Sequence, residues 1–331
     1  MKAIDVVQLI LKERFGAKPL HDEATAFAPA NIALCKYWGK RDEALNLPVT
    51  SSLSISLNNQ GATTNIRLQK HRDEVTLNGE LQSLDTVFSQ RLLRFLDLFR
   101  EGCDLHFKVD AQSDMPVGAG LASSACGFAA LVLALNQLFG WGLCERELSI
   151  LARLGSGSAS RSLWDGFVKW HAGNRSDGMD SFAEHLPYEW PSLCVGLCVL
   201  FKQQKSISSR EAMKRTVQTS PFYAAWKPTA DQDLLCLEQA IQSQDFELLG
   251  STAESNALAM HALILSSRPP ILYSQCETVT AMHTVWHLRA QGLPVYFTQD
   301  AGANLKLLFL KDASNAIRQA FPEVEMIEPF G

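Results

Sequence analysis

The chain has little excess charge, no long apolar run and no paired pattern of cysteines. Its 331 residues include 30 Lys and Arg against 35 Asp and Glu, which gives a formal net charge of −5. Nucleic-acid binding needs clustered cations, so this balance argues against nucleic acid as a partner. If the protein binds phosphate groups, the positive charge that meets them must be local.

Apolar stretches stay shorter than the about 20 residues that a membrane span needs. The first residues also lack the apolar core and cleavage site of a signal peptide, so we expect neither a membrane partner nor secretion. The eight cysteines lie mostly inside apolar runs, which indicates buried thiols and a cytoplasmic location. Cys194 and Cys198 are four residues apart, but no second pair of metal ligands follows, so no zinc site is predicted.

Hydrophobic periodicity predicts an α+β protein of about two domains. Residues 1–20 form an extra N-terminal helix and loop. Strand and helix patterns then continue to a change of composition near Pro191, which predicts domains at 1–190 and 191–331. Short strands are expected at 51–58 and 63–69, and later helices at about 209–227, 229–243, 246–264 and 272–291.

The stretch 115–130, MPVGAGLASSACGFAA, has the composition of a phosphate-binding loop. Gly118 and Gly120 allow a tight turn and close approach to a ligand, because neither carries a Cβ. Helical spacing follows from about Leu121 to Phe139. A helix N-terminus offers free N–H groups and a positive dipole end to phosphate oxygens, although a serine-capped helix would look similar.

Other phosphate and nucleophile motifs fit this loop poorly. A dinucleotide fingerprint has a third glycine where this chain has Ser123, and the first acidic residue after Gly120 is Glu145. The chain also lacks the G-x-x-x-x-G-K-[ST] run of a P-loop and the G-x-S-x-G of a serine hydrolase elbow.

The run P-x-x-x-G-L-A-S-S-A resembles the ATP loop of the GHMP kinase superfamily. Four further stretches resemble the mevalonate diphosphate decarboxylases of that superfamily. They are APANIALCKYWGKRD at 28–42, LPVTSSLSISL at 47–57, GSGSASRSLWDGFVKW at 155–170 and FTQDAGANLKLL at 297–308. These matches keep the family's order and cover nearly the whole chain.

The resemblance implies a two-domain GHMP kinase-like fold. An N-terminal ATP-binding domain would precede a C-terminal α/β sandwich, with the active site in the cleft between them. The implied reaction uses ATP and Mg²⁺ to phosphorylate the 3-hydroxyl of (R)-5-diphosphomevalonate. Loss of phosphate and carbon dioxide would then give isopentenyl diphosphate, a step of isoprenoid biosynthesis. Relatives are often homodimers, so a homodimer is a further expectation.

The resemblance also assigns roles to individual residues. ATP phosphates would lie on Gly118, Gly120, Leu121, Ala122, Ser123 and Ser124, with Ser124 nearest the transferred group and Mg²⁺. Asp300 would be the catalytic carboxylate at the 3-hydroxyl. There it would accept the hydroxyl proton and orient the hydroxyl oxygen toward the γ-phosphate. Lys36 would be its partner and hold it ionised. Outside this context, an Asp before Ala-Gly is more often a turn former.

The remaining implied residues bind the substrate. Arg161 would grip its carboxylate or diphosphate, since a guanidinium can donate two parallel bonds. The backbone and hydroxyl groups of Ser156, Gly157, Ser158, Ala159 and Ser160 would complete that anion pocket. The substrate segment would contain Asn31, Tyr37, Trp38, Gly39 and Lys40, with Lys40 at the diphosphate. Arg72 and Thr216 match substrate contacts through weaker local similarity.

Three alternatives remain open at this point. The protein could decarboxylate a mevalonate monophosphate, because sequence does not count phosphates, although Lys40, Arg72 and Arg161 favour a diphosphate. It could be a GHMP small-molecule kinase that does not decarboxylate. It could also be an inactive binding protein, against which the joint presence of Asp300, Ser124 and Arg161 argues.

Overall fold

The computed structural model describes residues 1–100, 102–114, 123–201, 203 and 205–331. Four positions that the sequence analysis assigns to ATP lie outside the described residues: Gly118, Gly120, Leu121 and Ala122.

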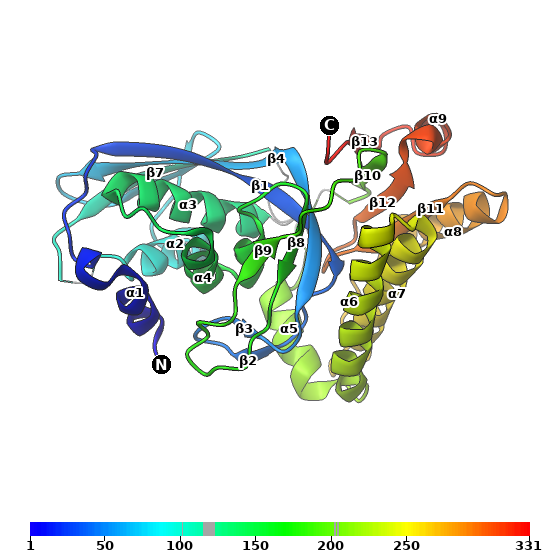
Figure 1. The fold of residues 1–331 in the computed structure, drawn as a ribbon, viewed down its shortest axis with the longest axis horizontal. Helices are drawn as coiled ribbons and strands as arrows, with labels where there is room; N and C mark the ends of the chain where they lie inside the picture. Colours follow the sequence, from blue (N-terminus) through cyan, green and yellow to red (C-terminus); the bar gives the residue numbers. More distant parts are fainter. Residues whose placement is uncertain (101, 115–122, 202, 204) are drawn as a thin grey trace.

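The chain begins with helix α1 (Ala3–Leu11), followed by a 3₁₀ turn at Lys12–Arg14. Val6, Val7, Ile10 and Leu11 form one buried stripe, as the amphipathic spacing predicts. The Arg14 side chain fastens this helix to the rest of the molecule, because it donates to the carbonyls of both Ile10 and Trp141. The N-terminal extension is therefore packed onto the first half of the protein (Figure 1).

The first half is built on a seven-stranded sheet in the order β6-β5-β7-β4-β8-β9, with β1 paired to β4. All of its pairs are antiparallel except β5 with β7. The strands are β1 (Glu23–Cys35), β4 (Ser52–Gln69), β5 (Glu74–Leu77), β6 (Glu80–Leu81), β7 (His106–Ser113), β8 (Phe167–Trp170) and β9 (Ala183–His185). A separate ribbon joins β2 (Lys40–Asp42) to β3 (Leu47–Pro48).

The two short strands expected at 51–58 and 63–69 are in fact one strand, β4, of 18 residues. Its pairing with β1 continues on both sides of a register shift between Pro29 and Asn31. A bulge of this kind bends a strand without ending it, which explains why the turn-like residues in its middle misled the prediction.

Three helices belong to the first half: α2 (Val87–Leu96), α3 (Ser123–Phe139) and α4 (Glu145–Gly155). Helix α3 packs against β1 and β4 through small and apolar side chains such as Ala129 and Leu135, both fully buried. A 3₁₀ turn at Gly157–Arg161 follows α4 directly. The sheet thus positions the start of α3 and this turn at one end of the half.

The second half has a four-stranded antiparallel sheet in the order β11-β12-β10-β13. Its strands are β10 (Leu193–Cys198), β11 (Val295–Gln299), β12 (Leu305–Leu310) and β13 (Glu325–Ile327). Helix α7 (Phe246–Leu265) covers one face, and α8 (Cys276–Ala290) and α9 (Ser314–Ala320) cover the other. Helices α5 (Ser209–Thr219) and α6 (Trp226–Ser243) pack on α7. None of the helices in the described ranges is long and apolar enough to cross a bilayer.

The helix expected at about 209–227 ends earlier, at Thr219. Ser220 adopts an extended conformation, ψ 122°, because the proline that follows it disfavours the helical region. A 3₁₀ turn at Tyr223–Ala225 then leads into α6.

The two halves meet where β1 and β4 run alongside α6 and α7 (Figure 1). The strands of the first sheet end at His185 and those of the second begin at Leu193. We therefore keep 190/191 as a proposed domain boundary. The end of β1, at Cys35, lies at the junction and delivers the residues that follow it to the space between the halves.

Candidate active site

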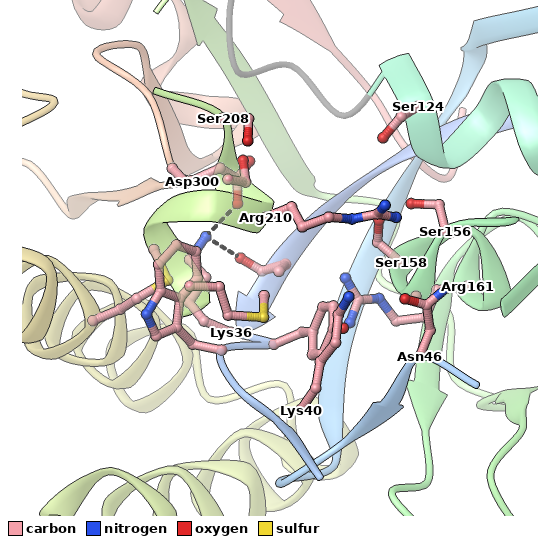
Figure 2. A pocket seen from close by; sticks show the side chains of 18 of the residues that line it. Lys36, Lys40, Asn46, Ser124, Ser156, Ser158, Arg161, Ser208, Arg210 and Asp300 are labelled. Carbon is pink, nitrogen blue, oxygen red and sulfur yellow. Dashed lines mark hydrogen bonds and ion pairs between the residues drawn. The ribbon is translucent and has the colours of Figure 1, made fainter. Parts of the chain in front are cut away.

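A cavity of about 360 Å³ lies at this junction, a size typical of small-molecule sites. In Figure 2, Asp300 and Ser208 lie on one side, Ser124, Ser156, Ser158 and Arg161 lie on the other, and Arg210 reaches between them. The described residues that line it are Asn31, Ala33, Lys36, Tyr37, Trp38, Lys40, Asn46, Arg91, Ser124, Ser156, Gly157, Ser158, Arg161, Lys205, Ser208, Ser209, Arg210, Met213, Met260, Asp300 and Ala301.

One end of the cavity is built around the carboxylate of Asp300, which follows β11 directly. The Lys36 Nζ lies 2.7 Å from its Oδ1, and the Lys306 Nζ lies 2.9 Å from its Oδ2. Burial by itself would raise the pKa of Asp300, but the two ammonium groups outweigh it and hold that pKa well below its usual range. Asp300 is therefore an anion at physiological pH.

Two opposing effects act on the pKa of Lys36. Burial lowers its pKa to about 8, although the charge of Asp300 acts in the raising direction. Its Nζ also donates to the Ala33 carbonyl at 2.7 Å, so the ammonium group is held at two points. The side chain is 2% exposed and the position of its charge is fixed.

The backbone around this pair is supported by α7. Asn256 accepts a hydrogen bond from the Lys36 backbone N–H at 2.8 Å and donates to Asp233 of α6 at 2.8 Å. The His261 Nε2 lies 3.1 Å from the Asp300 carbonyl and must donate, because a carbonyl oxygen only accepts. Burial lowers the pKa of His261 to about 4, so the ring is neutral. The carboxylate end thus has its hydrogen-bond partners in place before any substrate arrives.

The opposite end of the cavity holds Arg161, which is 3% exposed. Its Nη2 donates to Asn31 Oδ1 at 3.2 Å and its Nη1 donates to the Ser52 hydroxyl. Burial lowers the pKa of Arg161 to about 10, which leaves it charged at neutral pH. Within the described ranges no carboxylate forms an ion pair with Arg161. Its buried guanidinium therefore faces the cavity without a protein anion beside it.

Tyr37 lies beside this guanidinium with a buried hydroxyl that has no hydrogen-bond partner among the described residues. Burial raises the pKa of Tyr37, so it stays a neutral donor. The ring packs closely on Gly157, where a Cβ would come within 2.8 Å of it. A buried polar group without a partner is costly, and a ligand oxygen in the cavity would remove that cost.

Further cations stand around the cavity. Arg91 on α2 donates to the Gly155 carbonyl at 2.9 Å and stacks over the Phe128 ring at 4.7 Å. Lys205 donates to the Ala301 carbonyl at 2.9 Å, and burial lowers its pKa to about 8. With Lys36, Lys40, Arg161 and Arg210, the described part of the lining contains six cationic residues and, as its one carboxylate, Asp300. The cavity is suited to a multiply charged anion.

Most of the residues implied by the resemblance line this cavity. They are Asn31, Lys36, Tyr37, Trp38, Lys40, Ser124, Ser156, Gly157, Ser158, Arg161 and Asp300. Ala159 and Ser160 are buried behind it, where the Ser160 hydroxyl donates to the Gly157 carbonyl at 2.7 Å. Ser123 is the first residue of α3, and its side chain lies outside the description.

Three implied residues are not brought to the cavity. Gly39 is buried with φ +112°, and its backbone passes against the Tyr223 hydroxyl. Thr216 is buried within α5 and donates to the Ala212 carbonyl at 2.8 Å. Arg72 is exposed in the turn between β4 and β5.

Several site residues were not singled out from the sequence: Asn46, Arg91, Lys205, Ser208, Ser209, Arg210 and Lys306. Lys306 did carry a signal, because it is the one cation inside the apolar run NLKLLFL. The others stand among ordinary charged and polar residues, where periodicity does not separate a site residue from a solvated one. Asn46 lies between β2 and β3, Arg91 lies on α2, and the rest lie just before α5 or in its first turn: Lys205, Ser208, Ser209 and Arg210.

A magnesium ion bound here would have few protein ligands. In the described residues, no group of three His, Cys, Asp or Glu side chains could hold a metal ion. Mg²⁺ is commonly bound by phosphate oxygens with few protein ligands, so the Ser124 hydroxyl at the start of α3 and nucleotide phosphates would fit it.

Fold and cavity together define an α+β enzyme built of two halves. Its substrate is a small, multiply charged anion, and the ionised carboxylate of Asp300 is the group that acts on it. Two family models cover most of the chain. The "Diphosphomevalonate decarboxylase-like N-terminal domain" matches residues 28–183, and the "Mevalonate 5-diphosphate decarboxylase C-terminal domain" matches residues 195–328. The chain belongs to the diphosphomevalonate decarboxylase family.

Individual relatives agree with this membership. The chain is 37% identical over 318 residues to the diphosphomevalonate decarboxylase of Aspergillus fumigatus, covering 89% of this chain and 78% of that one. The mevalonate diphosphate decarboxylase of Staphylococcus aureus superposes with a TM-score of 0.87 at 37% identity, over 93% of this chain and 95% of the other. A structure described as "MDDEF in complex with MVAPP, AMPPCP and Magnesium" superposes with a TM-score of 0.85 at 39% identity, over 92% and 99%. The predicted GHMP kinase-like fold is confirmed.

Proposed function

We propose that this protein decarboxylates (R)-5-diphosphomevalonate with ATP and Mg²⁺, and releases isopentenyl diphosphate, ADP, phosphate and carbon dioxide. The observation that carries the proposal is Asp300, an ionised carboxylate held between two buried ammonium groups at a cavity lined by six cations. The complex with MVAPP, AMPPCP and magnesium belongs to a protein whose chain this one covers almost completely, which supports both ligands.

Substrate binding uses the end of the cavity opposite Asp300. Arg161, Tyr37 and Lys40 offer a guanidinium, a hydroxyl without a partner and an ammonium to the carboxylate and diphosphate of the substrate. Arg210 reaches into the same space from α5 (Figure 2). This arrangement leaves the 3-hydroxyl, in the middle of the substrate, close to Asp300.

The nucleotide would enter over the start of α3. Ser124 lines the cavity there, and we keep Gly118, Gly120, Leu121, Ala122 and Ser123 as the proposed cradle of the phosphates. Magnesium, when bound with the nucleotide, would supply positive charge that stabilises the phosphates. Lys205 and Arg91 would add charge from the protein beside it.

Asp300 orients the 3-hydroxyl by accepting its hydrogen bond. As the oxygen forms its bond to the γ-phosphorus and the bond to ADP breaks, the hydroxyl proton passes to Asp300 and from there to water, because Asp300 is a weak base. The C3–O bond then breaks with phosphate leaving. The electron pair of the C1–C2 bond becomes the C2=C3 double bond, and carbon dioxide departs.

The second stage places positive charge on C3 for a short time. The fixed anion of Asp300 stabilises that charge, and buried Met213 and Met260 give the cavity an apolar wall that excludes water.

A homodimer and a cytoplasmic location are further parts of the proposal. Thiols such as Cys35 and Cys198, buried in the core, are suited to a reducing compartment.

The test compares three substrates with the purified full chain and Mg-ATP: 5-diphosphomevalonate, 5-phosphomevalonate and mevalonate. We expect equal amounts of carbon dioxide, ADP and phosphate from the diphosphate, and turnover at least about 100-fold slower from the others. ADP without carbon dioxide would make the protein a kinase. Preference for the monophosphate would replace the proposed substrate. Sedimentation of the same preparation determines whether the protein is a dimer.

A further inference from the structure

Lys306 occupies an unusual place for a charged residue. It lies on β12, paired with Thr298 of β11 and Leu197 of β10, and is 1% exposed. Its neighbours Leu305 and Leu307 pack against α8 on one face of the sheet, so the Lys306 side chain points to the other face, toward the junction of the halves. It stands outside the described lining of the cavity.

The contact that Lys306 makes explains why it can be buried. Its Nζ lies 2.9 Å from Asp300 Oδ2, while Lys36 lies 2.7 Å from Oδ1, so each carboxylate oxygen has its own ammonium group. A buried lysine without a carboxylate partner costs several kcal/mol.

Neutralising Asp300 does not require both lysines. One ammonium balances one carboxylate, and the second, Lys306, leaves the cluster with an excess positive charge that repels Lys36 and Lys205. A cluster built only for stability would not contain this excess. What the second ammonium adds is geometry: with both oxygens held, the carboxylate cannot rotate about its Cβ–Cγ bond.

We infer that Lys306 is a positioning residue of the reaction, which holds the Asp300 carboxylate ionised and in one orientation toward the substrate hydroxyl. Lys306 stands outside the described lining of the cavity, contacts Asp300 directly and also acts on Lys36 through its charge. The inference rests on the proposed decarboxylation, since orientation of the hydroxyl matters only where that hydroxyl is phosphorylated.

Lys306→Met tests the inference, because methionine keeps the length of the side chain and removes its charge. We expect kcat to fall about 30-fold while the KM values for ATP and 5-diphosphomevalonate stay within about threefold. Lys306→Arg, which restores a cation, should recover most of the loss. Lys169→Met is the matched control, because Lys169 is also a strand lysine in an ion pair, with Glu238, but lies outside the cavity lining.

The pH profile separates positioning from a merely structural role. The charged groups around Lys36 are Asp300, Lys306 and Arg161, with neutral His261 behind the carboxylate. Lys205 interacts with Asp300 and Lys306. Lys36 is protonated below about pH 8, and kcat/KM should fall as pH rises through that value. Removing Lys306 removes a repulsion that lowers the pKa of Lys36, so in Lys306→Met the fall should occur at least about half a pH unit higher. The profile of Lys169→Met should match the wild type.

Three outcomes would overturn the inference: unchanged kcat in Lys306→Met, an equal loss at every pH with an unmoved alkaline limb, or a loss confined to KM. If Lys306→Met folds poorly, a double-mutant comparison of melting temperatures tests the same pairing. Asp300→Asn leaves two buried ammonium groups without a carboxylate, and adding Lys306→Met to it should raise the melting temperature. No rise would contradict the pairing. Because this readout needs no turnover, it stands even if the proposed decarboxylation fails.

Discussion

The two ends of the cavity differ in how their charges are balanced. At one end, the anion of Asp300 is held by Lys36 and Lys306, and the surrounding backbone is fixed by α7. At the other end, the cation of Arg161 has hydrogen bonds to neutral groups, and the buried hydroxyl of Tyr37 has no partner in the described part of the chain. We call them the carboxylate end and the anion end.

This difference separates two tasks of an enzyme site. The carboxylate end is complete without a ligand, so its contribution to catalysis is preorganised and should appear in kcat. The anion end is incomplete until a substrate arrives, so its contribution should appear in binding. Substitutions at the two ends should therefore change different kinetic constants.

Asp300→Asn should have the largest effect, because it removes the charge of the carboxylate end. We expect kcat to fall by at least about 1,000-fold, while the dissociation constant of ATP, measured by calorimetry, changes by less than about threefold. Asp97→Asn is the control, since that carboxylate is 57% exposed, forms its ion pair with Arg100 and is outside the described lining of the cavity. A variant that loses ATP binding along with turnover would contradict the division of tasks.

Arg161→Met should come next, because it removes the buried cation of the anion end. We expect the KM for 5-diphosphomevalonate to rise about 100-fold, with a smaller change in kcat. Arg94→Met on the exposed side of α2 is the matched control. Loss of kcat with an unchanged KM would mean that the two ends do not divide binding from chemistry. In the same assay Arg72→Met should resemble the wild type, since Arg72 is exposed and outside the cavity.

Tyr37→Phe should have the smallest effect and removes only a hydroxyl. We expect the KM for the substrate to rise about 10-fold and the free energy of unfolding to stay within about 0.5 kcal/mol, because that hydroxyl has no partner in the described structure. Tyr273→Phe is the contrast. Its hydroxyl donates to the Ile207 carbonyl at 3.1 Å, so its loss should cost about 1 kcal/mol of unfolding free energy in urea titrations. Equal stability losses in both variants would show that Tyr37 is satisfied within the protein.

The sequence predicted the fold class and most of the lining, and the reasons are local. Motif residues such as Asn31, Lys36, Tyr37 and Arg161 lie in segments whose order and spacing match one family, so their joint presence in one cavity followed. Element boundaries were less predictable where tertiary pairing decided them, as in the merging of two expected strands into β4.

The pairing of Lys36 with Asp300 followed from the family resemblance, but two other long-range contacts did not follow from the sequence. Lys306 meets Asp300 because β11 and β12 pair in a register that brings their ends together, and Asn256 meets Lys36 across 220 positions of sequence. Such contacts depend on how sheets and helices pack, which composition and spacing do not encode residue by residue. Weak local similarity also suggested Arg72, which is exposed and outside the described lining of the cavity, so its role stays a prediction.

Asn256 gives the molecule one more property. It joins α7 and α6 to the backbone of Lys36, and Lys36 in turn reaches across to Asp300, so the carboxylate end contains parts of both halves. Neither half holds a complete charge cluster alone, and a chain in which only one has folded leaves ions exposed that the other must cover. Turnover by this protein therefore requires both halves to be folded at their junction, and a chain with only one folded half should show no activity.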